Sequence, residues 1–197
     1  MFNSRPTAEN SQAFSLHTPV LSTERLVLRP PVREDAEDLA IIANAREIAE
    51  MTRRMPHPYG LDDANAFIDQ IESGGVEGHI YAVTLADTGH LIGMTSVERR
   101  QSQDALEVGY WLGKKWWGNG YASEACTAVV DLAFRVTGAD VIFATSRPIN
   151  LASRQVLMKQ GFEFVGRDEV GTLAAGRVQI DRYRLSRSGW LDNKSTN

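Results

Sequence analysis

The fold is decided by residues 106–122, which read LEVGYWLGKKWWGNGYA. The first half alternates as a strand does, and a helical spacing of apolar residues begins after Gly120. Between the two lies a short loop in which Gly118 and Gly120 flank Asn119. Such a loop at a helix N-terminus presents unpaired backbone N–H groups at the positive end of the helix dipole, which suits an anionic phosphate. The segment therefore predicts a strand, a phosphate-binding loop and a helix in succession.

The loop by itself does not identify its ligand. No Gly-Lys-Ser/Thr sequence follows it, so it is not a Walker loop, and Ser123 stands where the dinucleotide-binding fingerprint has its third glycine. A loop that only caps the helix would show the same pattern, and so would a loop that binds any of several phosphate-containing ligands.

Outward from this segment, the chain divides into strand and helix patterns. The expected strands are 25–29, 79–85, 91–97, 105–112, 141–145, 162–170 and 177–185, and the expected helices are 32–51, 64–71, one that opens at 118–120, and 150–160. Strand 141–145 is almost wholly apolar, which is typical of a strand buried on both faces. This order predicts an α/β fold whose mixed sheet has antiparallel pairs before and after a βαβ-like centre.

Composition narrows the class of protein. The 197 residues carry a formal net charge of −4, and we expect one domain over residues 21–186, with polar tails at 1–20 and 187–197 that contacts elsewhere could order. Cys126 is the only cysteine, which excludes an intrachain disulfide and a cysteine-rich metal site. The sequence has no clustered basic patch and no apolar run of about 20 residues. We therefore expect no nucleic-acid or membrane partner, no metal and a cytoplasmic location.

Several blocks of the sequence resemble the GNAT superfamily of N-acetyltransferases. Residues 115–120 fit its acetyl-CoA motif, Arg/Gln-x-x-Gly-x-Gly/Ala at the start of a long helix, with lysine in place of the Arg or Gln. Residues 117–125, 150–162 and 23–30 resemble one branch, the ribosomal-protein N-terminal (alanine/serine) acetyltransferases. The resemblance covers residues 21–185.

The resemblance implies a mostly antiparallel twisted sheet, flanked by helices, with a V-shaped splay between the strand of Glu107 and the strand of Val141. Acetyl-CoA would lie in the gap as co-substrate, its pantetheine arm paired with the backbone of Glu107 to Leu112, and an N–H near Val108 would polarise the thioester carbonyl. The acceptor would be a primary amine, either a protein N-terminus or a small molecule. An edge strand at 177–185 could join a homodimer.

The same resemblance places the acetyl-CoA site on the strand, the loop and the two helices that follow. Its expected residues are Val108, Trp111, Leu112, Lys115, Trp117, Gly118, Asn119, Gly120, Tyr121, Ala122, Asn150 and Ser153. Asn150 would hydrogen-bond the pantetheine arm, or else it is an ordinary helix N-cap. The tryptophans could equally be core or rim residues.

Acyl transfer to an amine requires a neutral nucleophile and a proton for the leaving thiolate. At about pH 7, deprotonation costs about 1.4 kcal/mol for an α-amine with a pKa of about 8, and about 4.6 kcal/mol for a lysine with a pKa of about 10.4. Glu107 is the predicted base, acting through water, because alternation puts it opposite Val108 and Tyr110, just upstream of the loop. The alternative is a strand glutamate paired with a neighbouring arginine.

Ser153 is the second predicted catalytic residue. The resemblance places its hydroxyl at the thioester sulfur as a proton donor, although Tyr121 or water could donate instead. Alternatively, Ser153 is an ordinary residue early in its helix. Glu124, in the first turn of the preceding helix, is expected chiefly to complement the helix dipole.

These residues together predict an N-acetyltransferase in which the amine attacks the thioester directly within a ternary complex. Cys126 falls on the apolar face of its helix, where a buried and inert thiol is expected, so no acetyl-enzyme is expected. The alternative is a catalytically silent acyl-CoA-binding or sensor protein. The presence of both Glu107 and Ser153 disfavours it.

Overall fold

The structure, a computed structural model, describes residues 18–100 and 105–196; residues 1–17, most of the expected N-terminal tail, lie outside that range. The strands are β1 (Leu21–Ser22), β2 (Leu26–Arg29), β3 (Gly78–Leu85), β4 (Leu91–Arg100), β5 (Ala105–Leu112), β6 (Val141–Ser146), β7 (Glu163–Thr172) and β8 (Gly176–Ser186). The α-helices are α1 (Ala36–Ala43), α2 (Arg46–Ala49), α3 (Leu61–Glu72), α4 (Tyr121–Val136), α5 (Leu151–Lys159) and α6 (Arg187–Thr196). None of these described helices is long and apolar enough to cross a membrane.

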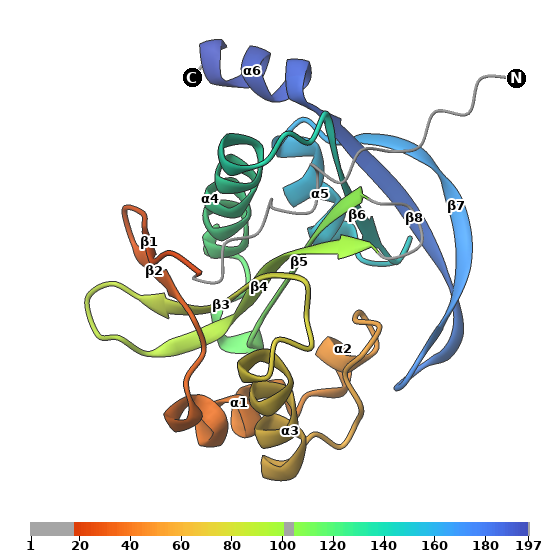
Figure 1. Cartoon of the computed structure of the whole chain (residues 1–197). Coiled ribbons are helices and arrows are strands. Elements are labelled where there is room, and N and C mark those ends of the chain that lie inside the picture. Colours follow the sequence, from red (N-terminus) through yellow and green to blue (C-terminus); the bar gives the residue numbers. More distant parts are fainter. Residues whose placement is uncertain (1–17, 101–104, 197) are drawn as a thin grey trace, which may run out of the picture.

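The strands form one sheet in the order β1-β2-β3-β4-β5-β6-β8-β7 (Figure 1). Among the described strands, the neighbours are antiparallel except for β5 and β6, which are parallel and are joined through α4. The expected α/β fold with a mixed, mostly antiparallel sheet is therefore confirmed.

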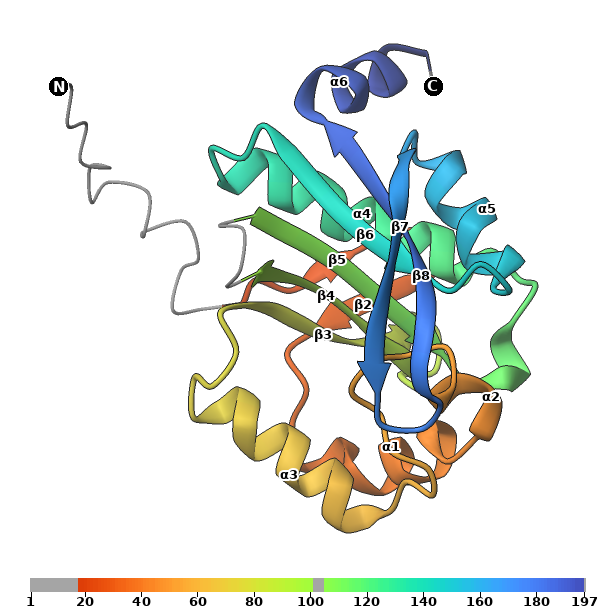
Figure 2. The same cartoon turned by 90° about the vertical axis from the view of Figure 1, so that its right-hand side faces the viewer.

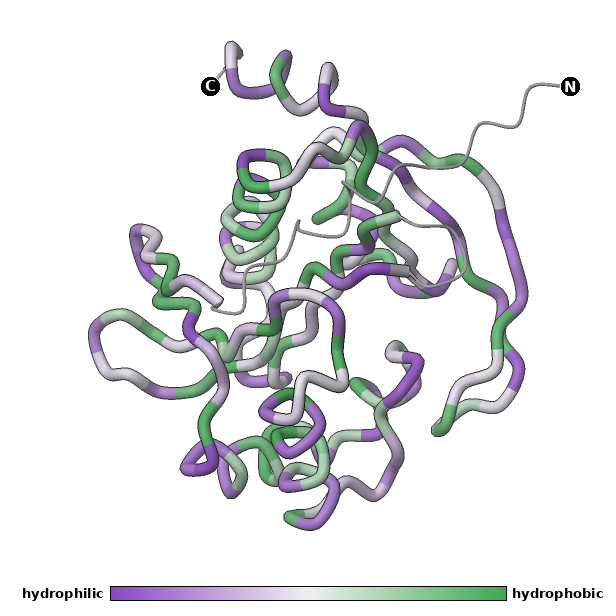
Figure 3. The backbone as a smooth tube through the Cα atoms, viewed as in Figure 1, coloured by the Kyte–Doolittle hydropathy of each residue, from purple (hydrophilic) through white to green (hydrophobic). Residues whose placement is uncertain are grey.

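Helices pack on both faces of the sheet (Figure 2). The buried cluster beneath α4 and α5 contains Val108, Cys126 and Leu157. The cluster beneath α1 and α3 contains Leu39 and Ile68. Along the β7–β8 hairpin, hydrophilic and hydrophobic stretches alternate (Figure 3). β8 has several buried residues, whereas no residue of β7 is buried.

β5 and β6 diverge after a short ladder. Their parallel pairing joins Leu106 with Ile142, Glu107 with Phe143 and Val108 with Ala144, and within the described residues it extends no further. β5 then continues to Leu112, paired with β4, while β6 continues to Ser146, paired with β8. The predicted splay is present, but it begins at Gly109 and not at Glu107, because the ladder still holds Glu107 and Val108.

The single helix predicted for 32–51 is wrong. α1 ends at Ala43 and α2 begins at Arg46, and Asn44 lies between them in a non-helical conformation. Its side-chain oxygen accepts a hydrogen bond of 3.1 Å from the backbone N–H of Tyr59. The break at Asn44 therefore accompanies a tertiary contact with the loop between α2 and α3, which apolar periodicity could not reveal.

Two strand predictions also need correction. β6 is not buried on both faces, because Phe143 and Thr145 are only half-buried while Ala144 is fully buried. The strand predicted at 177–185, β8, is not an edge strand, because it pairs with β6 on one side and β7 on the other. The edge of this half of the sheet is β7.

The segment predicted as a polar C-terminal tail forms α6. Arg187 donates hydrogen bonds of 2.8 Å to the carbonyls of Phe134 and Ala139, where α4 ends. The Trp190 ring stacks on Phe134 with 5.2 Å between centroids, and its Nε1 donates to Asp131 at 2.7 Å. Contacts to α4 therefore order a segment whose composition is polar.

Candidate active site

The predicted phosphate loop, residues 117–120, joins β5 and the 3₁₀ turn Lys114–Trp116 to α4. Gly118 and Gly120 have φ angles of 78° and 80°, in the left-handed region that glycine adopts without strain. The 16-residue helix α4 begins at Tyr121, directly after Gly120. Because the first N–H groups of a helix have no partner within it, this loop has the geometry predicted for an anion site.

Two hydrogen bonds brace the loop against the end of β5. The indole Nε1 of Trp117 donates to the Leu112 carbonyl at 2.7 Å, and Asn119 Nδ2 donates to the Trp117 carbonyl at 3.0 Å. The Trp117 side chain is 48% exposed, so it lies at the rim and not in the core.

Both lysines before the loop have partners. Lys114 forms an ion pair with Glu47 of α2 and donates a hydrogen bond to its carboxylate, and this hydrogen bond lowers the pKa of the Glu47 carboxyl. The Nζ atom of Lys115 lies 5.6 Å from the ring centroid of Trp116. Lys114 is therefore directed toward α2, and Lys115 stays the predicted phosphate ligand.

The Glu107 carboxylate on β5 accepts a hydrogen bond from β6, the strand on the other side of the splay. The Thr145 hydroxyl on β6 donates a hydrogen bond of 2.9 Å to Glu107 Oε1. Glu98 on β4 is the cross-strand partner of Glu107 and accepts hydrogen bonds of 2.7 Å from Arg54 and 2.8 Å from Ser96. Cross-strand partners share a face, so two carboxylates lie side by side on the face opposite Val108, close to where the splay begins.

Ser153 and Tyr110 meet on the other face of the sheet. The Tyr110 hydroxyl lies 3.0 Å from Ser153 Oγ and 3.2 Å from the Ser153 carbonyl oxygen. Burial raises the pKa of the Tyr110 phenol, which keeps it protonated. Sequence reasoning missed this pair, because only the packing of α5 on β5 joins residues so far apart along the chain.

Asn150 is the N-cap of α5. Its side-chain oxygen accepts a hydrogen bond of 3.0 Å from the Ser153 N–H, which is the capping role that the sequence left open. A contact with pantetheine would then use the amide nitrogen as donor. The helix ends before Gly161, whose φ of 83° fits the predicted glycine C-cap.

The other predicted acetyl-CoA residues fall on both sides of β5. Val108 and Leu112 belong to the core cluster under α4, with Tyr121 and Ala122 packed against it, whereas Trp111 packs on the cluster under α1 and α3. The structure thus brings the loop, the open side of β5 and Ser153 to the carboxyl-terminal half of β5. Acetyl-CoA contact at each residue stays a prediction.

A buried hydroxyl lies at the mouth of the splay. Ser146 ends β6, is 6% exposed, and its Oγ has no hydrogen-bond partner among the described residues. Leaving a buried polar group unpaired costs about 1–3 kcal/mol. Ser146 lies two residues beyond the last β5–β6 pair, at Ala144, so a polar chain in the gap would supply the missing partner.

Glu124 joins α4 to the turn between β1 and β2. Its Oε1 accepts hydrogen bonds from Thr23 Oγ1 at 2.6 Å and from the Arg25 N–H at 2.8 Å, and its Oε2 accepts one from Arg25 Nε at 2.8 Å. Burial alone would raise the pKa of Glu124, but the hydrogen bonds from Thr23 and Arg25 lower it. Sequence reasoning identified only the dipole effect and missed Arg25, because the turn is remote from the loop along the chain.

Cys126 is buried in the core, as expected. Burial raises the pKa of its thiol to about 12, so the thiol is protonated near neutral pH. It has neither the access nor the ionisation that a nucleophile needs.

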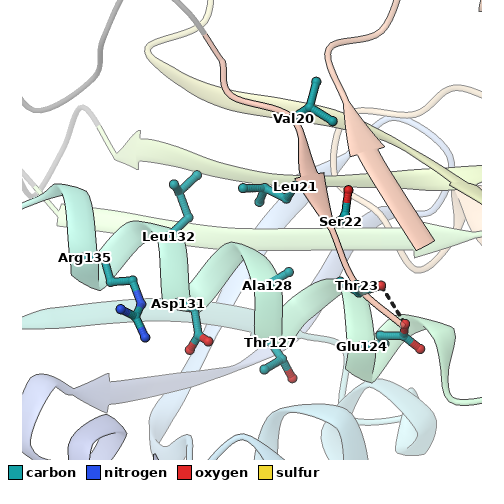
Figure 4. A pocket seen from close by; sticks show the side chains of 10 residues that line it. All are labelled: Val20, Leu21, Ser22, Thr23, Glu124, Thr127, Ala128, Asp131, Leu132 and Arg135. Atoms are coloured by element: carbon teal, nitrogen blue, oxygen red, sulfur yellow. Dashed lines mark hydrogen bonds between the residues drawn. The ribbon is translucent and has the colours of Figure 1, made fainter. Parts of the chain in front are cut away.

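A groove of about 560 Å³ lies between β1 and the outer side of α4 (Figure 4). Val20, Leu21, Ala128 and Leu132 supply its apolar lining, and Thr23 and Glu124 close one end. Neither Glu107 nor Ser153 lines this groove, so it is distinct from the predicted site.

Comparisons with known proteins identify the family of this chain. Residues 25–163 match the acetyltransferase (GNAT) domain family. The chain is 30% identical to the uncharacterized N-acetyltransferase p20 of Bacillus licheniformis, over 84% of this chain and 94% of that protein. It is also 30% identical to the [ribosomal protein uS5]-alanine N-acetyltransferase of Escherichia coli, over 74% of this chain and 79% of that protein. Among solved structures, Mycobacterium smegmatis RimJ in complex with CoA-disulfide has a TM-score of 0.71 at 20% identity, covering 83% of this chain and 82% of that chain.

The chain therefore belongs to the GNAT acetyltransferase family. It is an acetyl-CoA-dependent acyltransferase, and the resemblance to ribosomal-protein acetyltransferases seen in the sequence is confirmed.

Proposed function

We propose that this protein moves the acetyl group of acetyl-CoA to a primary amine, by direct attack within a ternary complex. The observation that carries the proposal is the splay between β5 and β6. Glu107 and Thr145 lie on one of its faces, and Tyr110 and Ser153 on the other. A thioester in the splay would have a base on the amine side and a proton donor on the thiol side.

In this proposal, the pantetheine arm lies along β5 as a strand would. Gly109 to Leu112 are paired with β4 on one side, and beyond Val108 their other side is open within the described chain. The Ser146 hydroxyl and the Asn150 amide nitrogen supply polar partners at the edge of the gap. The pyrophosphate accepts hydrogen bonds from the first N–H groups of α4, with Lys115 as an additional donor.

Glu107 acts on the amine. The acceptor's ammonium gives a proton through water to the carboxylate, and the nitrogen lone pair then attacks the carbonyl carbon of the thioester. Thr145 orients the carboxylate through its hydrogen bond. Glu98, the cross-strand neighbour of Glu107, is already ion-paired with Arg54.

Ser153 acts on the thiol. When the carbon–sulfur bond of the tetrahedral intermediate breaks, the thiolate takes a proton from the Ser153 hydroxyl. The second proton of the attacking nitrogen passes to solvent, and solvent returns a proton to Ser153. The Tyr110 phenol, 3.0 Å from Ser153 Oγ, holds the hydroxyl in place. Because Cys126 is buried, the acetyl group passes directly from sulfur to nitrogen without an acetyl-enzyme.

We propose a protein N-terminal α-amine or a small-molecule amine as the acceptor. An α-amine is the easier nucleophile, since a lysine costs about 3 kcal/mol more to deprotonate at about pH 7. The relationship to an enzyme named for the alanine of ribosomal protein uS5 supports trying peptides with a free N-terminus first.

The experiment is a screen of N-terminal peptides and small amines with acetyl-CoA. Thiol release is measured together with the mass gain of one acetyl group on the acceptor. Release that depends on an acceptor, with the matching mass gain, supports the proposal. Tight CoA binding without release for any acceptor favours the silent acyl-CoA-binding protein, and no thermal protection by CoA favours another phosphate ligand.

A further inference from the structure

Arg25 lies in the block 23–30 that resembles the acetyltransferase branch, although the sequence assigned it no role. Its backbone is held at both the N–H and the carbonyl. Its N–H donates to Glu124 Oε1 at 2.8 Å, and its carbonyl accepts a hydrogen bond of 2.9 Å from the Ala86 N–H. The backbone of Arg25 is thus anchored between α4 and Ala86, the residue that follows β3. Its side chain starts from a rigid position although it is 45% exposed.

From that position the guanidinium reaches three parts of the phosphate site. Nη1 donates to the Asn119 carbonyl at 3.0 Å, and Nη2 lies 2.7 Å from Glu124 Oε2. The guanidinium carbon is 4.7 Å from the ring centroid of Tyr121. One side chain therefore ties together the loop, the first residue of α4 and its first turn. Figure 4 shows Glu124 at this junction, with its hydrogen bond from Thr23.

The bond to Asn119 controls the direction of an N–H group. In a trans peptide unit the C=O and N–H bonds point in opposite directions, so holding the Asn119 carbonyl toward Arg25 directs the Gly120 N–H away from it. With a glycine on each side of Asn119, this stretch of backbone has little conformational preference of its own. The arginine adds a restraint on the Asn119 carbonyl to the one that the Asn119 side chain provides through the Trp117 carbonyl.

The ion pair also offsets an unfavourable charge. A carboxylate in the first turn stabilises a helix, but at that place it repels a bound phosphate. Glu124 is such a carboxylate, and Arg25 neutralises it at 2.7 Å. Removing the arginine would leave a negative charge beside the pyrophosphate position.

We infer that Arg25 is a positioning residue for acetyl-CoA: it sets the phosphate loop for pyrophosphate binding and cancels the charge of Glu124. The inference rests on the proposed placement of the pyrophosphate at the start of α4. It concerns binding of the diphosphate part of the cofactor and does not depend on which amine is acetylated.

The test compares acetyl-CoA with acetyl-pantetheine, which lacks the phosphates. Arg25→Ala should raise KM for acetyl-CoA about tenfold, as expected for losing a hydrogen bond from a charged donor, and change KM for acetyl-pantetheine by less than about twofold. Arg135→Ala is the matched control: like Arg25, this arginine lies against an aromatic ring, but it sits near the far end of α4, with its guanidinium carbon 5.9 Å from the Trp190 ring centroid. It should leave both KM values unchanged. Equal KM changes for the two substrates in Arg25→Ala, or no change, would overturn the inference.

Two further variants separate positioning from folding. Arg25→Lys keeps the charge without the planar fork of donors and should fall between wild type and Arg25→Ala. Adding Glu124→Gln to Arg25→Ala should recover part of the lost affinity, since it removes the uncompensated carboxylate. If the double variant binds no better than Arg25→Ala, charge cancellation is wrong.

Calorimetry with CoA keeps this test independent of turnover. If the wild-type chain binds CoA but acetylates no amine, the proposed acetyl transfer is wrong. The Kd values of the Arg25 variants for CoA still test the inference about Arg25. The expected order of Kd is wild type equal to Arg135→Ala, then Arg25→Lys, then Arg25→Ala. If Arg25→Ala unfolds, Arg25→Lys decides, and an unchanged Kd for CoA in that variant would count against the role.

Discussion

The Thr145 hydroxyl donates a hydrogen bond of 2.9 Å to Glu107 Oε1 across the β5–β6 boundary. The residues sit close to where the two strands separate, since the ladder pairs Glu107 with Phe143 and ends at Val108 and Ala144. The hydrogen bond from Thr145 therefore orients the proposed base, Glu107, at the point where β5 and β6 separate. This coupling makes Glu107 and Thr145 the first residues to test.

Replacing Glu107 by Gln should lower kcat about 100-fold or more, as expected for loss of a general base. The loss should be greatest where the amine is mainly protonated, so the rate is measured across pH with one acceptor. Thr145→Val should lower kcat less, because it removes one hydrogen bond to the carboxylate and keeps the carboxylate itself. Glu163→Gln, at a 72% exposed side chain on β7, serves as the control. A pH–rate profile identical to wild type would remove Glu107 from the mechanism.

Tyr110, which is partly buried, and Tyr81, which is fully buried, give a pair of variants that tests the Ser153 contact. Tyr110→Phe removes a hydroxyl that lies 3.0 Å from Ser153 Oγ, and it should lower the free energy of unfolding by about 1 kcal/mol. Tyr81→Phe removes a buried hydroxyl without a hydrogen-bond partner among the described residues, so it should be neutral or stabilising. Urea unfolding measures both. Equal losses would show that the contact with Ser153 contributes nothing specific.

Arg187→Ala should destabilise the fold by about 2 kcal/mol, since it removes charge-assisted hydrogen bonds to the carbonyls of Phe134 and Ala139. Lys194→Ala, on the same helix, breaks only a surface ion pair with Asp131 and should cost at most about 1 kcal/mol. Thermal unfolding compares the two variants. A larger loss for Lys194→Ala would contradict the anchoring role of Arg187.

Glu124 should make the fold sensitive to acid. Its pKa in the folded state lies below the ordinary value of 4.5, so its contribution to stability is complete above that value and is lost as pH falls through the folded pKa. Glu124→Gln should therefore be less stable than wild type at about pH 7, with the difference shrinking toward about pH 3. Denaturant unfolding at several pH values checks this, and a constant difference would contradict it.

Cys126→Ala should keep kcat within about twofold of wild type, because transition-state stabilisation in direct attack does not involve the thiol. Iodoacetamide should likewise leave activity unchanged, since burial raises the thiol pKa to about 12. An acetyl group trapped on Cys126 by rapid quenching and mass spectrometry would overturn the direct mechanism.

Much of the fold could be predicted from local patterns. The strand from Ala105 to Leu112, the glycines of the loop and the helix from Tyr121 follow from spacing and backbone preference, and the structure places them so. The break at Asn44 and the helix at Arg187 could not be predicted in this way. Both depend on hydrogen bonds to residues distant in the sequence, Tyr59 in one case and the end of α4 in the other.

The candidate site shows the same division. Alternation correctly put Glu107 and Tyr110 on opposite faces, but nothing in the sequence showed that Thr145 or Ser153 would meet them. Arg25 was missed because its role lies in contacts with Asn119 and Glu124, which only the packing of the β1–β2 turn on α4 creates. Residue type predicted the chemistry, and tertiary structure selected the partners.

The short β5–β6 ladder has a consequence for how long the protein survives. Among the described residues, three pairs join β5 to β6, and pantetheine in its proposed place would add backbone hydrogen bonds across this boundary. A ligand that binds only the folded state raises stability by RT ln(1 + [L]/Kd). Resistance to proteolysis should then rise and fall with the acetyl-CoA supply, so that the abundance of the enzyme would follow the availability of its own substrate.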